Sequence, residues 1–175
     1  MNDRLPQHAN TVLAAGYPLA YLLTFTTYGT RLHGDQRGSV NKRNNQYGKL
    51  FLHENKQIEN WQLRSLRDEK LLLNGTFRKT VRRTIEEVAR HNSWHLRALN
   101  VRTNHVHIVV SGDATPELIM NSLKSWATRG LKEGGVQREN GTYWTRHGST
   151  GYLWTPQDVE SACQYVVEQQ GEDLQ

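Results

Sequence analysis

The chain has 175 residues, which suits one domain with a buried core, and we expect a single domain over residues 1–175 with a loose polar tail over 1–17. Its formal net charge of +5 favours polyanionic partners, nucleic acid above all. It has no long apolar run, no signal-peptide pattern and only one cysteine, which argues against a membrane protein and an internal disulfide and favours a reducing, cytoplasmic location.

The first predicted element is a β-strand over residues 19–27, which alternate and are rich in β-forming side chains. One face of this strand carries Tyr21, Leu23 and Phe25, and the other carries Leu22, Thr24 and Thr26. Residues 29–75 resemble an insertion whose role the sequence does not reveal, with at least one short helix expected between 50 and 73. Arg31 stands in its Gly- and Arg-rich first part, where it could contact a phosphate backbone or belong to a floppy surface loop.

Apolar residues three and four positions apart predict a helix over 76–92, with Thr76 as its cap. Arg82 and Arg83 lie on the polar face of this helix. Clustered arginines suit DNA phosphates, although a solvated helix face has the same pattern.

The second half of the chain predicts a hairpin, two helices and a short strand. Residues 94–101 and 104–110 form two strands joined by a tight turn, so they should pair antiparallel. A Thr-Pro signal begins a helix over 116–131, and a second begins a helix over 156–170. We expect one more short strand near 142–146. This order predicts an α+β fold in which helices cover an antiparallel sheet.

The histidine strand is the centre of the predicted site. His105 and His107 flank one hydrophobe, so both side chains leave the same face of the strand, while Val106, Ile108 and Val110 face a core. Two neutral imidazoles on one face can bind one divalent metal. The alternative is a pair of structural histidines.

The last predicted helix could supply the rest of the site. Tyr165 and Gln169 are four residues apart and share one helical face, so a phenol nucleophile would stand beside an amide oxygen. Two imidazoles and one amide oxygen suit Mg²⁺ or Mn²⁺, with water and phosphate oxygens completing the coordination shell. The alternative is that Tyr165 only packs.

Lys124 and Arg129 form a second basic cluster, on the predicted helix over 116–131. Lys124 could promote ionisation of Tyr165, contact the DNA backbone or be a solvated helix lysine. The candidate DNA-binding residues are therefore Lys124, Arg129, Arg31, Arg82 and Arg83.

Asn-His-Val-His-Ile-Val-Val, at 104–110, resembles the histidine–hydrophobe–histidine (HUH) motif, and Tyr-Val-Val-Glu-Gln, at 165–169, resembles the Tyr-x-x-x-Gln signature. Together, in this order, they resemble the single-tyrosine HUH transposases of the insertion sequence 200/605 type and the related REP-associated tyrosine transposases. Ser-Leu-Lys-Ser-Trp, at 122–126, is also similar to the family. The likeness covers roughly residues 21–170.

The resemblance implies a ferredoxin-like HUH fold and cleavage and rejoining of single-stranded DNA. It implies His105, His107 and Gln169 as metal ligands and Tyr165 as the nucleophile that forms a 5′-phosphotyrosine. It further implies a homodimer that binds hairpins at the ends of a mobile element, often with the tyrosine helix of one subunit completing the site of the other.

Two alternatives remain from the sequence. The chain could be a domesticated protein that binds hairpins without cutting, or a structural protein with incidental histidines. Tyr143 and Tyr152 are rival nucleophiles, but neither has Gln or Asn four residues later, which favours Tyr165.

Overall fold

The computed structural model describes residues 16–31 and 56–168, and the structural statements below refer to these ranges. The predicted tail over 1–17 lies almost entirely outside them, as does most of the first half of the insertion-like stretch over 29–75.

The fold contains four strands and four helices in the described ranges. Their order is β1 (Ala20–Thr26), α1 (Lys56–Arg64), α2 (Gly75–His91), β2 (His95–Val101), β3 (His105–Ser111), α3 (Pro116–Glu133), β4 (Ser149–Leu153) and α4 (Pro156–Glu168). The strands form one antiparallel sheet in the order β2-β3-β1-β4. The succession β1-α2-β2-β3-α3-β4 with this strand order is the ferredoxin-like arrangement. The predicted fold class is therefore confirmed.

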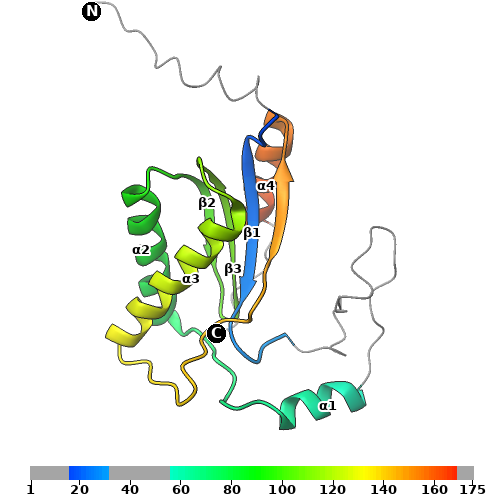
Figure 1. The fold of residues 1–175 in the computed structure, drawn as a ribbon, viewed down its shortest axis with the longest axis vertical. Coiled ribbons are helices and arrows are strands. Elements are labelled where there is room, and N and C mark those ends of the chain that lie inside the picture. Colours follow the sequence, from blue (N-terminus) through cyan, green and yellow to red (C-terminus); the bar gives the residue numbers. More distant parts are fainter. Residues whose placement is uncertain (1–15, 32–55, 169–175) are drawn as a thin grey trace, which may run out of the picture.

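The sheet separates two cores of unequal size, because successive side chains of a strand face opposite sides. Leu23, Phe25, Val106 and Ile108 pack with α2 and α3 in the larger core. On the other side, Ala20, Ala98, Val109 and Leu153 pack with Val159, Ala162 and Val166 of α4 in the smaller core. Figure 1 shows α2 and α3 on one side of the sheet and α4 on the other. The histidines of β3 face the α4 side, which is called the histidine face below.

Strands β1 and β3 lie at the centre of the sheet, and their register fixes what stands beside the histidines. Thr24 pairs with His107, and Thr26 pairs with His105. The predicted division of the first strand, with its threonines on one face, is thus correct, and both threonines lie on the histidine face.

Helix α2 begins two residues earlier than predicted, because its cap is Asn74 and not Thr76. Asn74 precedes the helix in an extended conformation, and its side-chain oxygen accepts a hydrogen bond from the N–H of Phe77 at 2.9 Å. Thr76 is instead the second residue of the helix. An asparagine at this position satisfies one of the N–H groups that the first helical turn leaves without a partner.

The short strand predicted near 142–146 is wrong in its position. This segment makes one isolated bridge, between Thr27 and Trp144, and the fourth strand is β4 at 149–153. Gly148 precedes β4 and lies so close to β1 that an added Cβ would come within 2.5 Å of the Thr24 carbonyl oxygen. Gly148 and Gly151 resemble loop residues in the sequence, but at 148 the missing side chain lets two backbone segments approach each other.

The described part of the insertion-like stretch contains the expected short helix, α1, and an extended segment that reaches the core. In that segment, Leu71 and Leu73 are buried, and their N–H groups donate to the carbonyls of Tyr28 and Thr103. This part of the stretch therefore belongs to the folded domain. Among the helices within 16–31 and 56–168, none is long and apolar enough to cross a membrane.

Candidate active site on the histidine face

His105 and His107 lie side by side on the histidine face, as their spacing predicts. Their ring centroids are 4.7 Å apart, and the rings meet edge to face at 79°. His107 is buried and His105 is half-buried. The strand holds them there because Val106 and Ile108 point into the larger core on the opposite side and are fully buried.

Each imidazole has a hydrogen bond at its Nδ1 atom. The distance from His107 Nδ1 to Thr24 Oγ1 is 2.7 Å, and the distance from His105 Nδ1 to Asn104 Oδ1 is also 2.7 Å. A ring held at Nδ1 presents Nε2 as the nitrogen that can bind a metal.

Tyr165 lies next to the histidine pair in the same chain. Its ring centroid is 5.7 Å from that of His107, and 40% of the residue is exposed, which leaves room for a substrate to approach. Helix α4 holds Tyr165 there through the buried Val159, Ala162 and Val166. Asn100, which pairs with His107 in the sheet, also donates from Nδ2 to the carbonyl of Val166 at 2.8 Å.

The two rival tyrosines belong to the opposite side of the sheet. Tyr143 is buried in the larger core, where its hydroxyl donates to the carbonyl of Val136 at 2.6 Å and burial raises its pKa. Tyr152 pairs with Tyr21 in the sheet and packs edge to face against it, and Tyr21 belongs to the same core. Neither rival lies on the histidine face.

The third predicted ligand, Gln169, lies outside the described residues, and α4 is described as far as Glu168. Its role stays a prediction. Within the described ranges, no three His, Cys, Asp or Glu side chains form a group that could hold a metal. The donors present here, two imidazoles offering Nε2, fit Mg²⁺ or Mn²⁺ when oxygen ligands from a phosphate and water complete the shell.

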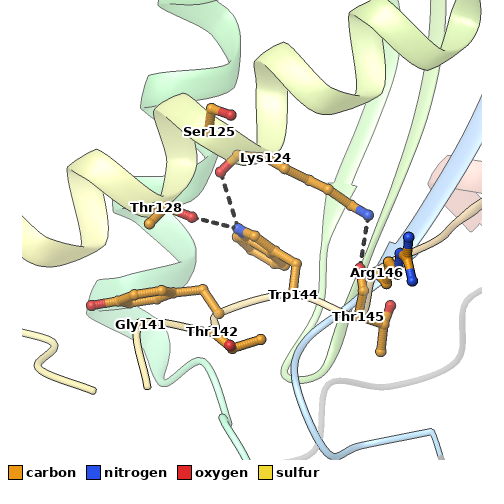
Figure 2. Close-up of a pocket in the computed structure, with 9 residues that line it drawn as sticks. Lys124, Ser125, Thr128, Gly141, Thr142, Trp144, Thr145 and Arg146 are labelled. Atoms are coloured by element: carbon orange, nitrogen blue, oxygen red, sulfur yellow. Dashed lines mark hydrogen bonds between the residues drawn. The ribbon is translucent and has the colours of Figure 1, made fainter. Parts of the chain in front are cut away.

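Lys124 does not lie on the histidine face. It is buried beside Phe25 in the layer formed by α3. Its Nζ donates to the carbonyl of Thr145 at 2.9 Å (Figure 2). It also donates to the carbonyl of His147 at 3.3 Å. The alternative of a solvated helix lysine is therefore wrong, and the sheet separates Lys124 from Tyr165. Lys124 borders an open pocket of about 260 Å³, so a DNA contact there stays a prediction.

The burial of Lys124 makes stability depend on pH. Burial lowers its pKa from 10.5 to about 8, so between these values the unfolded chain binds more protons than the folded chain. The wild type should therefore become more stable relative to Lys124→Met as the pH rises from about 8 to 10.5. Below that range, the difference between their free energies of unfolding should stay constant. We expect the wild type to gain about 1–2 kcal/mol of stability relative to the variant. This gain is less than the full pKa shift implies, because two carbonyl oxygens and nearby solvent favour the charged amine.

Urea unfolding of both proteins at several pH values from about 7 to 10 measures this difference. Lys132→Met, which removes an exposed lysine of the same helix, is the matched control and should show no such rise. A difference between wild type and Lys124→Met that does not change with pH would contradict the prediction.

The other predicted DNA-binding residues occupy two places. Arg31 is exposed and follows Thr30, whose hydroxyl donates to the carbonyl of Asn104, so Arg31 lies at the end of the sheet where His105 stands. Arg82 and Arg83 on α2 and Arg129 on α3 are exposed in the helical layer on the far side of the sheet. The structure does not bring these three arginines next to the histidines.

A ferredoxin-like sheet with two adjacent histidines on a central strand, and with a tyrosine on the terminal helix beside them, is the arrangement of the HUH nucleases that the sequence resembles. The family model described as "Transposase IS200 like" matches residues 65–169, which include His105, His107 and Tyr165. The chain belongs to this family.

One solved structure shares this fold, and a second is similar at a lower score. A REP-associated tyrosine transposase bound to a REP hairpin is 13% identical, with a TM-score of 0.51 over 86% of this chain and 65% of its own. A candidate transposase from Deinococcus radiodurans R1 is 14% identical, with a TM-score of 0.45 over 89% of this chain and 94% of its own. The chain thus spans about two thirds of the hairpin-bound transposase. None of the curated proteins matches it.

Proposed function

We propose that this protein is a metal-dependent transposase that cleaves and rejoins single-stranded DNA through a 5′-phosphotyrosine on Tyr165. The observation that carries the proposal is the position of Tyr165, partly exposed and 5.7 Å between ring centroids from His107 on the histidine face. Membership of the IS200-like transposase family supports the same reaction class.

In the proposed reaction, the phenolic oxygen of Tyr165 attacks a DNA phosphorus in line with the bond to the 3′ oxygen. The new P–O bond joins the 5′ phosphate to Tyr165, and the bond to the 3′ oxygen breaks and leaves a 3′-OH after protonation. A second DNA 3′-OH then attacks the phosphotyrosine, restores a phosphodiester and releases the phenol. Because one phosphodiester replaces another, no external energy source is needed.

His105 and His107 would hold a divalent ion, Mg²⁺ or Mn²⁺, with Gln169 as the proposed third ligand. When bound, the ion would supply positive charge to the non-bridging phosphate oxygens. The protein itself orients the phenol, because α4 is anchored to the sheet by its buried face and by Asn100.

The proposed DNA contacts divide between the two sides of the sheet. Arg31 would contact the DNA strand near the scissile phosphate. Over the helical layer, DNA phosphates would be contacted by Arg82, Arg83 and Arg129. The hairpin in the related transposase structure supports a hairpin substrate here. A homodimer and a cytoplasmic location are also part of the proposal and rest on the family resemblance and on the sequence.

A covalent-trapping assay tests the proposed function. Labelled single-stranded oligonucleotides from the DNA flanking the gene are incubated with the protein, with and without Mg²⁺ or Mn²⁺, and resolved on a denaturing gel. We expect a metal-dependent protein–DNA adduct that is lost in Tyr165→Phe and in His105→Ala/His107→Ala, because these changes remove the nucleophile and the metal ligands.

Tyr152→Phe is the matched control, since it removes the hydroxyl of a similarly exposed tyrosine on the other side of the sheet. It should keep the adduct. An adduct that survives Tyr165→Phe would reject the assignment of the nucleophile. Tight hairpin binding by the wild type without any adduct would instead identify a binder that does not cut.

A further inference from the structure

Thr24 and Asn104 each contact the Nδ1 atom of one of the two histidines. Thr24 belongs to the neighbouring strand β1 and stands opposite His107 in the sheet, where its hydroxyl lies 2.7 Å from His107 Nδ1. Asn104 precedes β3, and its side-chain oxygen lies 2.7 Å from His105 Nδ1.

The chemistry of these partners selects one tautomer of His105 and is compatible with the same tautomer of His107. An amide oxygen only accepts hydrogen bonds, so the contact with Asn104 requires the proton on Nδ1 of His105 and places the ring lone pair on Nε2. The hydroxyl of Thr24 can accept as well as donate, so it supports the same tautomer of His107. In both rings the nitrogen with the lone pair is then the one that binds a metal.

Both partners are themselves fixed by backbone contacts. The carbonyl of Asn104 accepts from the N–H and hydroxyl of Thr27 at 2.9 and 3.1 Å, and from the hydroxyl of Thr30 at 3.3 Å. Thr24 lies in the middle of a central strand, with Gly148 packed against its carbonyl. The backbone of both partners is thus held in place, and each side chain already contacts its histidine ring, which lowers the entropic cost of binding a ligand.

We infer that Thr24 and Asn104 are positioning residues that hold His107 and His105 as Nδ1–H tautomers and direct both Nε2 atoms to one divalent ion. This inference rests on the proposed function, because it assumes that the histidine pair binds the metal. It extends the site to β1, which lies outside the part of the chain matched by the family model. Partners of this kind commonly contribute 10- to 100-fold in metal affinity.

The test compares substitutions that keep or remove the hydrogen-bonding atom. Thr24→Val replaces the hydroxyl with a methyl of similar size, and Thr24→Ser keeps the hydroxyl. We expect Mn²⁺ to bind about 10- to 100-fold more weakly to Thr24→Val, measured from the electron paramagnetic resonance signal of unbound Mn²⁺, and within about threefold of wild type to Thr24→Ser. Asn104→Ala should weaken Mn²⁺ binding similarly, and circular dichroism confirms that each variant is folded.

A second measurement reports the tautomers in the protein without metal. Long-range ¹H–¹⁵N correlation spectra of the histidine rings should show Nδ1–H for both rings in the wild type. Thr24→Val should alter the ring correlations of His107 and leave those of His105 unchanged. Asn104→Ala should alter the ring correlations of His105 and leave those of His107 unchanged. A merely structural role would lower stability without this selective change.

Wild-type affinity for Mn²⁺ in Thr24→Val and Asn104→Ala, or equal weakening in Thr24→Ser and Thr24→Val, would overturn the inference. So would ring spectra that the substitutions leave unchanged. Failure of the wild type to bind Mn²⁺ would reject the metal site of the proposed function, and the ring spectra would still show whether the two side chains hold the rings.

Discussion

Mixing a Tyr165→Phe variant with a His105→Ala/His107→Ala variant is expected to leave single-stranded DNA uncleaved. In the covalent-trapping assay, the mixture should stay several orders of magnitude below the wild type, as each variant does alone. The reason is that one chain supplies both halves of the site. Tyr165 lies beside His107 of its own chain, so every subunit in the mixture lacks either the proposed nucleophile or the proposed metal ligands.

The anchoring of α4 supports this expectation. The helix buries Val159, Ala162 and Val166 against the histidine face, and Asn100 binds the carbonyl next to Tyr165. Moving this helix off its own sheet would break that hydrogen bond and expose the two valines, at about 1.5–3 kcal/mol for each side chain. These contacts would be recovered only if the same helix of a second subunit took its place.

The control for the mixing experiment is proof that subunits exchange. Differently tagged copies of the two variants should be purified together after mixing, if the protein is a dimer, and the recovered complex should then be assayed. A clear return of the adduct in that complex would contradict the prediction. It would show that the tyrosine of one subunit acts on the histidines of the other, as the family resemblance also allows.

The positions of β1, β2 and β3 could be predicted from residue patterns, whereas the ferredoxin-like sheet was implied by the family resemblance. Residues 19–27 and 104–110 alternate, and the structure keeps the predicted faces. The threonines and histidines share one face with Leu22 and Val109, which pack on the α4 side. Strand β4 could not be recognised in the same way. Gly148 before the strand and Gly151 and the exposed Tyr152 within it are typical of a loop. The pairing of β4 depends on close contact with β1 at Gly148, which is a tertiary feature.

The placement of His105 and His107 on one face of β3 could also be predicted, because alternate side chains of a strand point the same way. The position of Tyr165 beside them agrees with its motif, whereas Gln169 lies outside the described residues and stays a prediction. Thr24 and Asn104 were missed as partners of the histidines, although a signal existed. Threonines on the polar face of a strand beside the histidine strand are natural hydrogen-bond partners. The strand register that pairs Thr24 with His107, however, cannot be predicted from the residues near Thr24 in the sequence.

Lys124 shows the opposite limit of sequence reasoning. A lysine among helical residues is usually solvated, but this one satisfies the carbonyls of Thr145 and His147, which lie more than twenty residues away in the chain. Its burial is decided by where the segment before β4 crosses α3. No local pattern contains that information, so the residue could be singled out from the sequence but its environment could not.

The triple variant Arg82→Ala/Arg83→Ala/Arg129→Ala is expected to bind hairpin DNA at least about tenfold more weakly than the wild type at low salt. All three side chains are exposed in the helical layer. Arg82 forms an ion pair with Glu86 at 3.7 Å, and Arg83 forms one with Glu87 at 3.9 Å. Such exposed ion pairs are weak, so a DNA phosphate can replace the carboxylate. Arg129 stacks over Trp126 at 4.3 Å, which keeps its guanidinium at the surface.

The measurement is hairpin affinity as a function of salt concentration. Each lost phosphate contact should reduce the slope of log K against log salt by about one, so the triple variant should lose up to about three. Mn²⁺ binding should not change, because the sheet separates these arginines from His105 and His107. That combination would place hairpin binding and metal binding on opposite sides of the sheet.

Arg97→Ala is the matched control for the triple variant. Arg97 is exposed, and its Nε donates to the hydroxyl of Ser111, at the end of β3 farthest from His105. The Arg97→Ala variant loses one positive charge that lies outside the helical layer. The slope of log K against log salt should therefore stay nearly unchanged. If the triple variant and Arg97→Ala lose the same affinity per charge removed, the arginines act only through net charge. The DNA must then be held elsewhere, with Arg31 beside the histidine face as the first residue to substitute.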